Sequence, residues 1–116
     1  MIRTLIVEDD ALVARTMGRL LSRHFDVVDA VTDGEEALRR VELDAIDLVI
    51  TDFDLGRGMT GIDLAHRIRD VRPEIRIIMV SGSSPTISES DGIDAFLTKP
   101  ALIPELIATI RRVTGD

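Results

Sequence analysis

The sequence predicts an α/β domain in which a five-stranded parallel sheet carries helices on both faces. Strand-like and helix-like patterns alternate along the chain, which is typical of β-α-β units and a parallel sheet. Runs such as residues 77–80 are apolar without alternation, which suits a strand that is buried on both faces. The 116 residues form a single domain, residues 1–116, that is large enough for a substantial core.

Five short apolar runs rich in β-branched residues are expected to form the strands. They occupy residues 4–7, 27–31, 46–51, 75–80 and 95–98.

Four further segments have the apolar spacing of helices. In the first, Val13, Met17, Leu20 and Leu21 share one helix face. The second covers residues 35–42. The third follows Thr60 as N-cap and ends before Pro73, and the last has Pro104 near its first turn.

The segment between Ser81 and Ala95 does not fit this pattern. It is rich in Ser, Gly and Asp, with Ile87 and Ile93 as its large apolar residues. A full amphipathic helix is therefore not expected here. We expect the fourth helix to be short or irregular, with a turn or two beginning near Pro85.

Composition excludes several classes of function. The formal net charge is −7, with a pI of about 4.7, so the chain is a poor candidate for binding nucleic acid. It has no cysteine, and no apolar run approaches the length of a membrane span. Acidic residues follow Val7 almost at once, so no signal peptide is expected. A cytoplasmic location without membrane contact is the expectation.

Acidic residues end two of the predicted strands. Asp52 ends one apolar run, and Glu8-Asp9 follows another. If these runs are neighbouring parallel strands, three carboxylates meet at one edge of the sheet. At about 4 Å, each pair of like charges costs roughly 4 kcal/mol near a protein surface, against a domain stability of about 5–15 kcal/mol. The cluster therefore predicts a bound cation.

Several short motifs occur in order along the chain, each at an expected strand or helix end. They are Val7-Glu8-Asp9-Asp10, the helix start at 33–38, the strand 47–52, residues 61–64, Ser81-Gly82 and residues 96–100. In these motifs the whole chain resembles the receiver domains of two-component response regulators, of the flavodoxin-like chemotaxis type. The resemblance implies a sheet with strand order 2-1-3-4-5.

The resemblance also implies a chemistry for the acidic cluster. Asp52 would be the phosphoacceptor, whose carboxylate attacks the phosphoryl group of a phosphohistidine donor. Glu8, Asp9, Asp52 and the backbone carbonyl of Asp54 would bind Mg²⁺, an ion that prefers hard oxygen ligands.

The remaining family positions complete the implied site. Lys99 would contact a phosphoryl oxygen, and the Ser81 hydroxyl would donate to another. Ser81 and Phe96 would form the switch, with Phe96 in the place of the family's reporting aromatic residue. The Lys99-Pro100 bond is expected to be cis.

The resemblance implies protein partners rather than small substrates. They are a histidine kinase or histidine phosphotransfer protein, and a downstream protein target. The chain would then catalyse only its own phosphorylation and dephosphorylation. Two alternatives stay open: a haloacid-dehalogenase-like phosphohydrolase using Asp52 and Asp54, or a degenerate receiver that binds proteins without phosphorylation.

The chain departs from the usual family spacing in two places. Gly61 follows Asp52 by nine residues (61 − 52), about one more than usual, and Gly56 stands where proline is common. Lys99 follows Ser81 by 18 residues (99 − 81), roughly one helical turn fewer than usual. The shorter segment puts the standard output surface in doubt.

Overall fold

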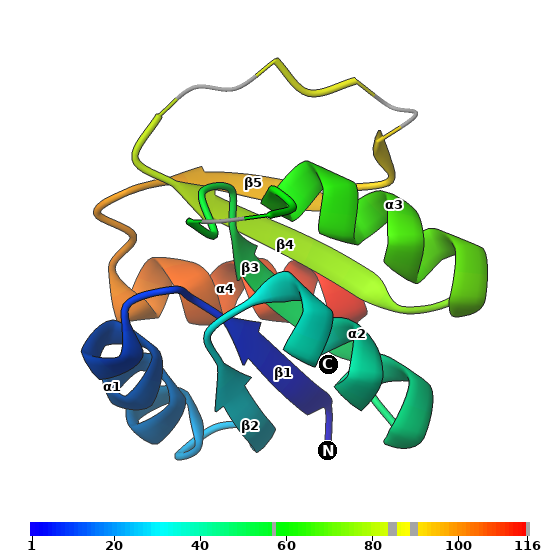
Figure 1. Cartoon of the computed structure of the whole chain (residues 1–116). Coiled ribbons are helices and arrows are strands. Elements are labelled where there is room, and N and C mark those ends of the chain that lie inside the picture. The colour runs from blue at the N-terminus through cyan, green and yellow to red at the C-terminus, as the bar shows by residue number, and fades with distance from the viewer. Residues whose placement is uncertain (57, 84–85, 89–90, 116) are drawn as a thin grey trace.

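The computed structural model describes residues 1–56, 58–83, 86–88 and 91–115. Five strands, all pairing in parallel, form one sheet in the order β2-β1-β3-β4-β5 (Figure 1). They are β1 (Arg3–Val7), β2 (Asp26–Val31), β3 (Leu48–Asp52), β4 (Arg76–Ser81) and β5 (Ala95–Thr98). The fold class and the strand order expected from the sequence are confirmed. The bounds of β5 are the expected ones, and those of the other four strands differ from the expected ones by one or two residues.

The α-helices are α1 (Ala11–Leu21), α2 (Gly34–Leu43), α3 (Gly61–Val71) and α4 (Ile103–Thr114). Three of them begin at residues whose side chains cap them, and α4 has Pro104 in its first turn instead. The Asp10 carboxylate accepts hydrogen bonds from the first turn of α1, and Asp33 does the same for α2. Thr60 caps α3 in a capping box with Asp63. These local bonds fix where each chain segment leaves the sheet edge.

The helices cover both faces of the sheet, two on each side (Figure 1). Along β1, Leu5 and Val7 pack toward α2 and α3, while Ile6 packs toward α1 and α4. This alternation continues in β3 and β4, whose residues are buried on both faces. The central strands that carry the acidic residues therefore lie between two hydrophobic cores.

The connection between β4 and β5 differs from the other crossovers. Its described residues, 82–83, 86–88 and 91–94, contain no α-helix, which confirms that a regular fourth crossover helix is missing here. The turn expected at Pro85 lies outside the described residues. In this structure α4 is therefore the C-terminal helix, after β5.

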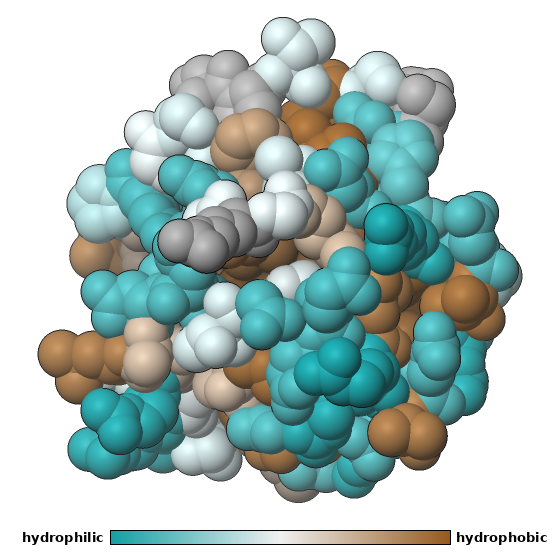
Figure 2. Space-filling view, viewed as in Figure 1, coloured by the Kyte–Doolittle hydropathy of each residue, from teal (hydrophilic) through white to brown (hydrophobic). Residues whose placement is uncertain are grey.

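The surface has the character expected of an acidic protein in water. The face shown in Figure 2 is mostly hydrophilic, with scattered hydrophobic residues between the polar ones. Within the part of the chain that the structure describes, no helix has the length and apolar character needed to cross a membrane.

Candidate functional site

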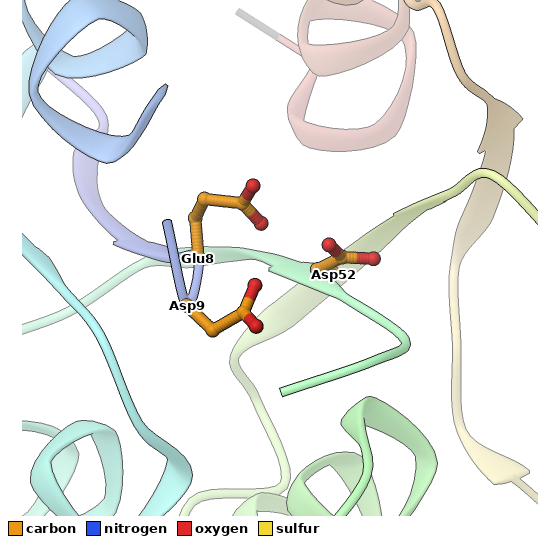
Figure 3. A group of neighbouring side chains, drawn as sticks. All are labelled: Glu8, Asp9 and Asp52. Carbon is orange, nitrogen blue, oxygen red and sulfur yellow. The ribbon is translucent and has the colours of Figure 1, made fainter. Parts of the chain in front are cut away.

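Three carboxylates meet at the edge of the sheet where the parallel strands end. Glu8 and Asp9 follow β1, and Asp52 is the last residue of the adjacent strand β3. Figure 3 shows the three side chains turned toward a common point. Each supplies an oxygen, and these oxygens lie within 4.8 Å of one another. Glu8 and Asp52 are buried, at 5% and 8% exposure, whereas Asp9 is open to solvent.

Lys99 brings a positive charge into the cluster from the end of β5. Its Nζ lies 2.7 Å from Asp52 Oδ2 and 3.5 Å from Glu8 Oε1. The backbone N–H of Lys99 donates to the Ser81 carbonyl at 2.8 Å, which ties the end of β5 to the end of β4. The Lys99-Pro100 bond is cis, as the sequence predicted.

The protonation of these groups reflects their crowding. Burial, and after it a hydrogen bond with Asp52, raise the pKa of Glu8 to about 7 against the opposing charge of Lys99. Burial lowers the pKa of Lys99, but its hydrogen bond to Asp52 and the two carboxylate charges outweigh that effect, so the pKa is raised overall. The site thus holds more negative charge than its lysine neutralises.

The donor set fits a small divalent cation. Three carboxylates on two rigid strand ends offer hard oxygen ligands, which Mg²⁺ prefers to nitrogen or sulfur. The raised pKa of Glu8 points the same way, because a cation would offset the burial, and the smaller repulsion from Asp52, that favour its protonated form.

The loop after β3 passes beside the cluster. The Asp54 backbone N–H reaches Asp52 Oδ1 at 3.4 Å, while the Asp54 side chain accepts a hydrogen bond from the Gly56 N–H at 3.0 Å. Gly56 has a φ of 73°, and a Cβ there would lie 3.6 Å from Asp9 Oδ2. Asp54 is therefore a neighbour of the acceptor through its backbone, with its carboxylate turned back into the loop.

Ser81 and Phe96 lie on β4 and β5. Ser81 is buried, and its hydroxyl pairs with the Ser83 hydroxyl at 3.1 Å and accepts the Ser83 N–H at 3.1 Å. Phe96 is half-buried and lies in register with Met79. Among the described residues, Phe96 belongs to neither core cluster. Both residues occupy their expected places, with Ser81 engaged by its own loop.

Sequence reasoning missed the contacts that hold residues 91–94 against α3. His66 Nε2 lies 2.8 Å from Asp91 Oδ1, and Arg69 contacts both Gly92 and Asp94. Helix periodicity identifies the exposed positions of α3 but not what contacts them. These pairs are 23 or 25 residues apart and share no motif, so nothing in the sequence pattern indicates them.

Comparison with known proteins places the chain in a family. A family model described as the response regulator receiver domain matches residues 4–111. The chain belongs to this family. It is a receiver domain, the phosphoacceptor signalling module of response regulators, and the comparisons favour neither the phosphohydrolase nor the degenerate receiver.

Individual relatives agree with this assignment. The transcriptional regulatory protein CutR of Streptomyces coelicolor is 34% identical over 113 residues, covering 94% of this chain and 52% of CutR. The chain thus spans about half the length of the curated relatives it matches.

Solved structures of receiver domains superpose closely on this one. A CheY-like receiver domain protein from Methanospirillum hungatei has a TM-score of 0.92 at 26% identity, covering 99% of this chain and 94% of that one. The response regulator TrrA from Thermotoga maritima, solved in complex with Mg²⁺-BeF, has a TM-score of 0.87 at 26% identity, covering 97% and 99%.

Proposed function

We propose that Asp52 is the phosphoacceptor and takes a phosphoryl group from a phosphohistidine. The observation that carries this proposal is the setting of the Asp52 carboxylate, which has Lys99 Nζ at 2.7 Å and two further carboxylates within 4.8 Å. An aspartate held only for stability would gain nothing from two acidic neighbours whose charge one lysine cannot neutralise.

Each oxygen of Asp52 has a separate contact. Lys99 holds Oδ2, and the backbone N–H of Asp54 reaches Oδ1. In the proposed transfer, a carboxylate oxygen of Asp52 forms a bond to phosphorus while the bond from phosphorus to the donor imidazole breaks. The Lys99 ammonium then lies where it can stabilise the charge of the transferred group's oxygens.

Glu8, Asp9, Asp52 and the backbone carbonyl of Asp54 would hold Mg²⁺. The ion, when bound, would neutralise charge on the acceptor and on the transferring group. The Mg²⁺-BeF complex of TrrA supports this assignment by similarity. Asp9 is the exposed member of the set and would be the first to meet the ion from solvent.

Ser81 and Phe96 would report the phosphorylated state. The Ser81 hydroxyl would leave its hydrogen bond with Ser83 and donate to a phosphoryl oxygen instead. This change would move the start of the β4–β5 connection. Phe96 cannot form a hydrogen bond through its ring, so it would respond only by packing.

The donor would be a histidine kinase or histidine phosphotransfer protein, and a downstream protein would receive the signal. An open groove lies beside Lys99 and is lined in part by Val13, Met17 and Pro100. Through this groove the site would be accessible to a partner protein. On this proposal the chain acts catalytically only on itself, in the cytoplasm.

The test uses a small phosphodonor. Incubation with acetyl phosphate and Mg²⁺ is expected to add the mass of one phosphoryl group to the wild type and nothing to Asp52→Ala. Asp70→Ala, which removes an exposed aspartate of α3, serves as the control and is expected to behave as wild type. An unmodified wild type would favour the degenerate receiver, and repeated turnover of a generic phosphate ester would favour the phosphohydrolase.

A further inference from the structure

Arg69, near the end of α3, binds two other parts of the chain with one guanidinium group. Its Nε and Nη2 donate to the Gly92 carbonyl at 3.0 and 2.6 Å, and Nη2 also meets Asp94 Oδ2 at 2.8 Å. Its Nη1 donates to the Pro73 carbonyl at 2.9 Å and to the Ile75 carbonyl. The side chain is only 24% exposed, so its bonds to the Gly92 and Ile75 carbonyls are partly shielded from water.

Gly92 is shaped for this contact. Its φ of 72° lies in the region that glycine adopts without strain. A Cβ at this position would lie 2.8 Å from Arg69 Nε and 2.9 Å from Arg69 Cγ. Any larger residue would therefore both strain the backbone and push the arginine away.

Asp94 links the Arg69 contact to β5, because it also forms hydrogen bonds with the backbone of β4. Its carboxylate accepts the backbone N–H of Ile77 at 2.7 Å, and its own N–H donates to the Ile77 carbonyl at 2.8 Å. These bonds set the register of β5 on β4 immediately before the strand begins at Ala95. A register slip of one residue would turn every β5 side chain to the opposite face.

Lys99 follows β5, five residues after Asp94 (99 − 94). Strand β5 has only four residues and forms the edge of the sheet, so pairing with β4 alone holds it weakly. The described residues of the β4–β5 connection contain no α-helix that could pack on the sheet and anchor the start of β5. Arg69 and Asp94 supply an anchor of a different kind.

We propose that Arg69 is a positioning residue for phosphoryl transfer, which acts by fixing β5 and thereby the place of Lys99 against Asp52. This inference rests on the proposed role of Lys99. Glu8, Asp9 and Asp52 are carried by β1 and β3, so they are outside the reach of this anchor. The anchor therefore holds the strand before the lysine, but not the backbone that carries the three carboxylates.

The test is a double-mutant cycle on the rate of phosphorylation by acetyl phosphate at saturating Mg²⁺. Lys99→Ala is expected to slow the reaction about 100-fold, the usual effect of losing one charge-stabilising donor. Arg69→Gln is expected to slow it about tenfold, because a misplaced catalytic group loses part of its effect. The double variant is expected to be no slower than Lys99→Ala alone, because Arg69 acts through Lys99.

Mg²⁺ affinity, measured by calorimetry, separates positioning from general damage. Arg69→Gln is expected to bind Mg²⁺ within about twofold of wild type, a change too small to count as a lost interaction. Arg67→Gln, on the same helix but in an exposed ion pair with Glu35, is the matched control and is expected to react at the wild-type rate. Gly92→Ala enters the same cycle as a second variant, because it displaces the arginine without removing it.

The outcomes distinguish this inference from the function on which it rests. If Lys99→Ala reacts at the wild-type rate, the proposed role of Lys99 fails and this inference falls with it. If Lys99→Ala is slow while Arg69→Gln and Gly92→Ala are both unchanged, only the inference is overturned. A double variant a further tenfold slower than Lys99→Ala, or a loss of Mg²⁺ affinity equal to the loss of rate, overturns it as well.

Discussion

Ionisation of Glu8 carries an electrostatic cost, because its carboxylate is buried beside Asp52. Its pKa is raised from 4.5 to about 7 in the folded chain. A raised pKa means that the folded state binds this proton more tightly than the unfolded state does. The stability so gained is complete below pH 4.5 and is lost as the pH rises through about 7.

Glu8→Gln tests this sign, because glutamine resembles the protonated acid and does not titrate. With a chelator present, the variant is expected to be more stable than wild type at pH 8, by about 1–3 kcal/mol, and the two are expected to converge near pH 4.5. Urea unfolding at both pH values measures the difference. Glu42→Gln, at an exposed position, is the control; an equal gain there would mean that net charge alone is responsible.

Asp54 offers a second prediction at the scale of one residue. Its carboxylate accepts the Gly56 N–H at 3.0 Å and so holds the loop beside Asp52. Asp54→Ala and Asp54→Asn are expected to change the rate of phosphate loss from Asp52 by more than about twofold, because small shifts of groups around a reacting centre alter its rate. Loss of radiolabelled phosphate over time measures this, and equal rates would show that the carboxylate has no part in phosphate loss.

How far the sequence predicts the site depends on the kind of contact. Apolar runs and the rule that parallel strands end at one edge place Glu8, Asp9 and Asp52 on the same edge, whereas the strand order that makes them neighbours came from the resemblance. The place of Lys99 came from resemblance, because a single lysine after a strand has no pattern of its own. The contacts of Arg69 lay beyond both, since they join a helix face to a loop without periodicity.

At the scale of elements, the close approach of α3 to the end of β3 requires a glycine at position 61. A Cβ on Gly61 would lie 2.2 Å from the backbone oxygen of Asp52, and the Gly61 N–H donates to the Phe53 carbonyl at 2.7 Å. The first residue of α3 thus packs directly on the end of β3. The pattern of apolar residues predicted both elements, but not this close approach.

Gly61→Ala is therefore expected to destabilise the fold by about 1–3 kcal/mol and to slow phosphorylation, because the helix must move away from Asp52. Gly18→Ala is the matched control, since its Cβ would meet only Ala30, Ile6 and Val27 at ordinary distances of 3.7–3.8 Å. It is expected to stabilise α1 by about 0.5–1 kcal/mol. Thermal unfolding of both variants measures the contrast, and a Gly61→Ala variant as stable as wild type would contradict it.

At the scale of the whole molecule, the strands that carry the acidic site are packed differently from the connection between β4 and β5. The strands that carry the carboxylates lie between two hydrophobic cores. The described part of the β4–β5 connection, by contrast, lacks a helix. The two ends of that connection are held differently. Ser81 and Ser83 join at its start, and α3 holds residues 91–94 at its end.

The different contacts at the two ends of the β4–β5 connection predict which of its residues respond to phosphorylation of Asp52. A beryllofluoride mimic with Mg²⁺ is expected to draw Ser81 away from Ser83 and so to change hydrogen exchange over residues 82–83 and 86–88. Residues 91–94 are expected to change little, because Arg69 and His66 hold them to α3 whether or not the site is loaded. Hydrogen exchange with and without the mimic measures both segments in one experiment, with Asp52→Ala as the control that binds no mimic. Equal changes in the two segments would show that the whole connection moves as one unit, and no change in either would place the output of the switch elsewhere.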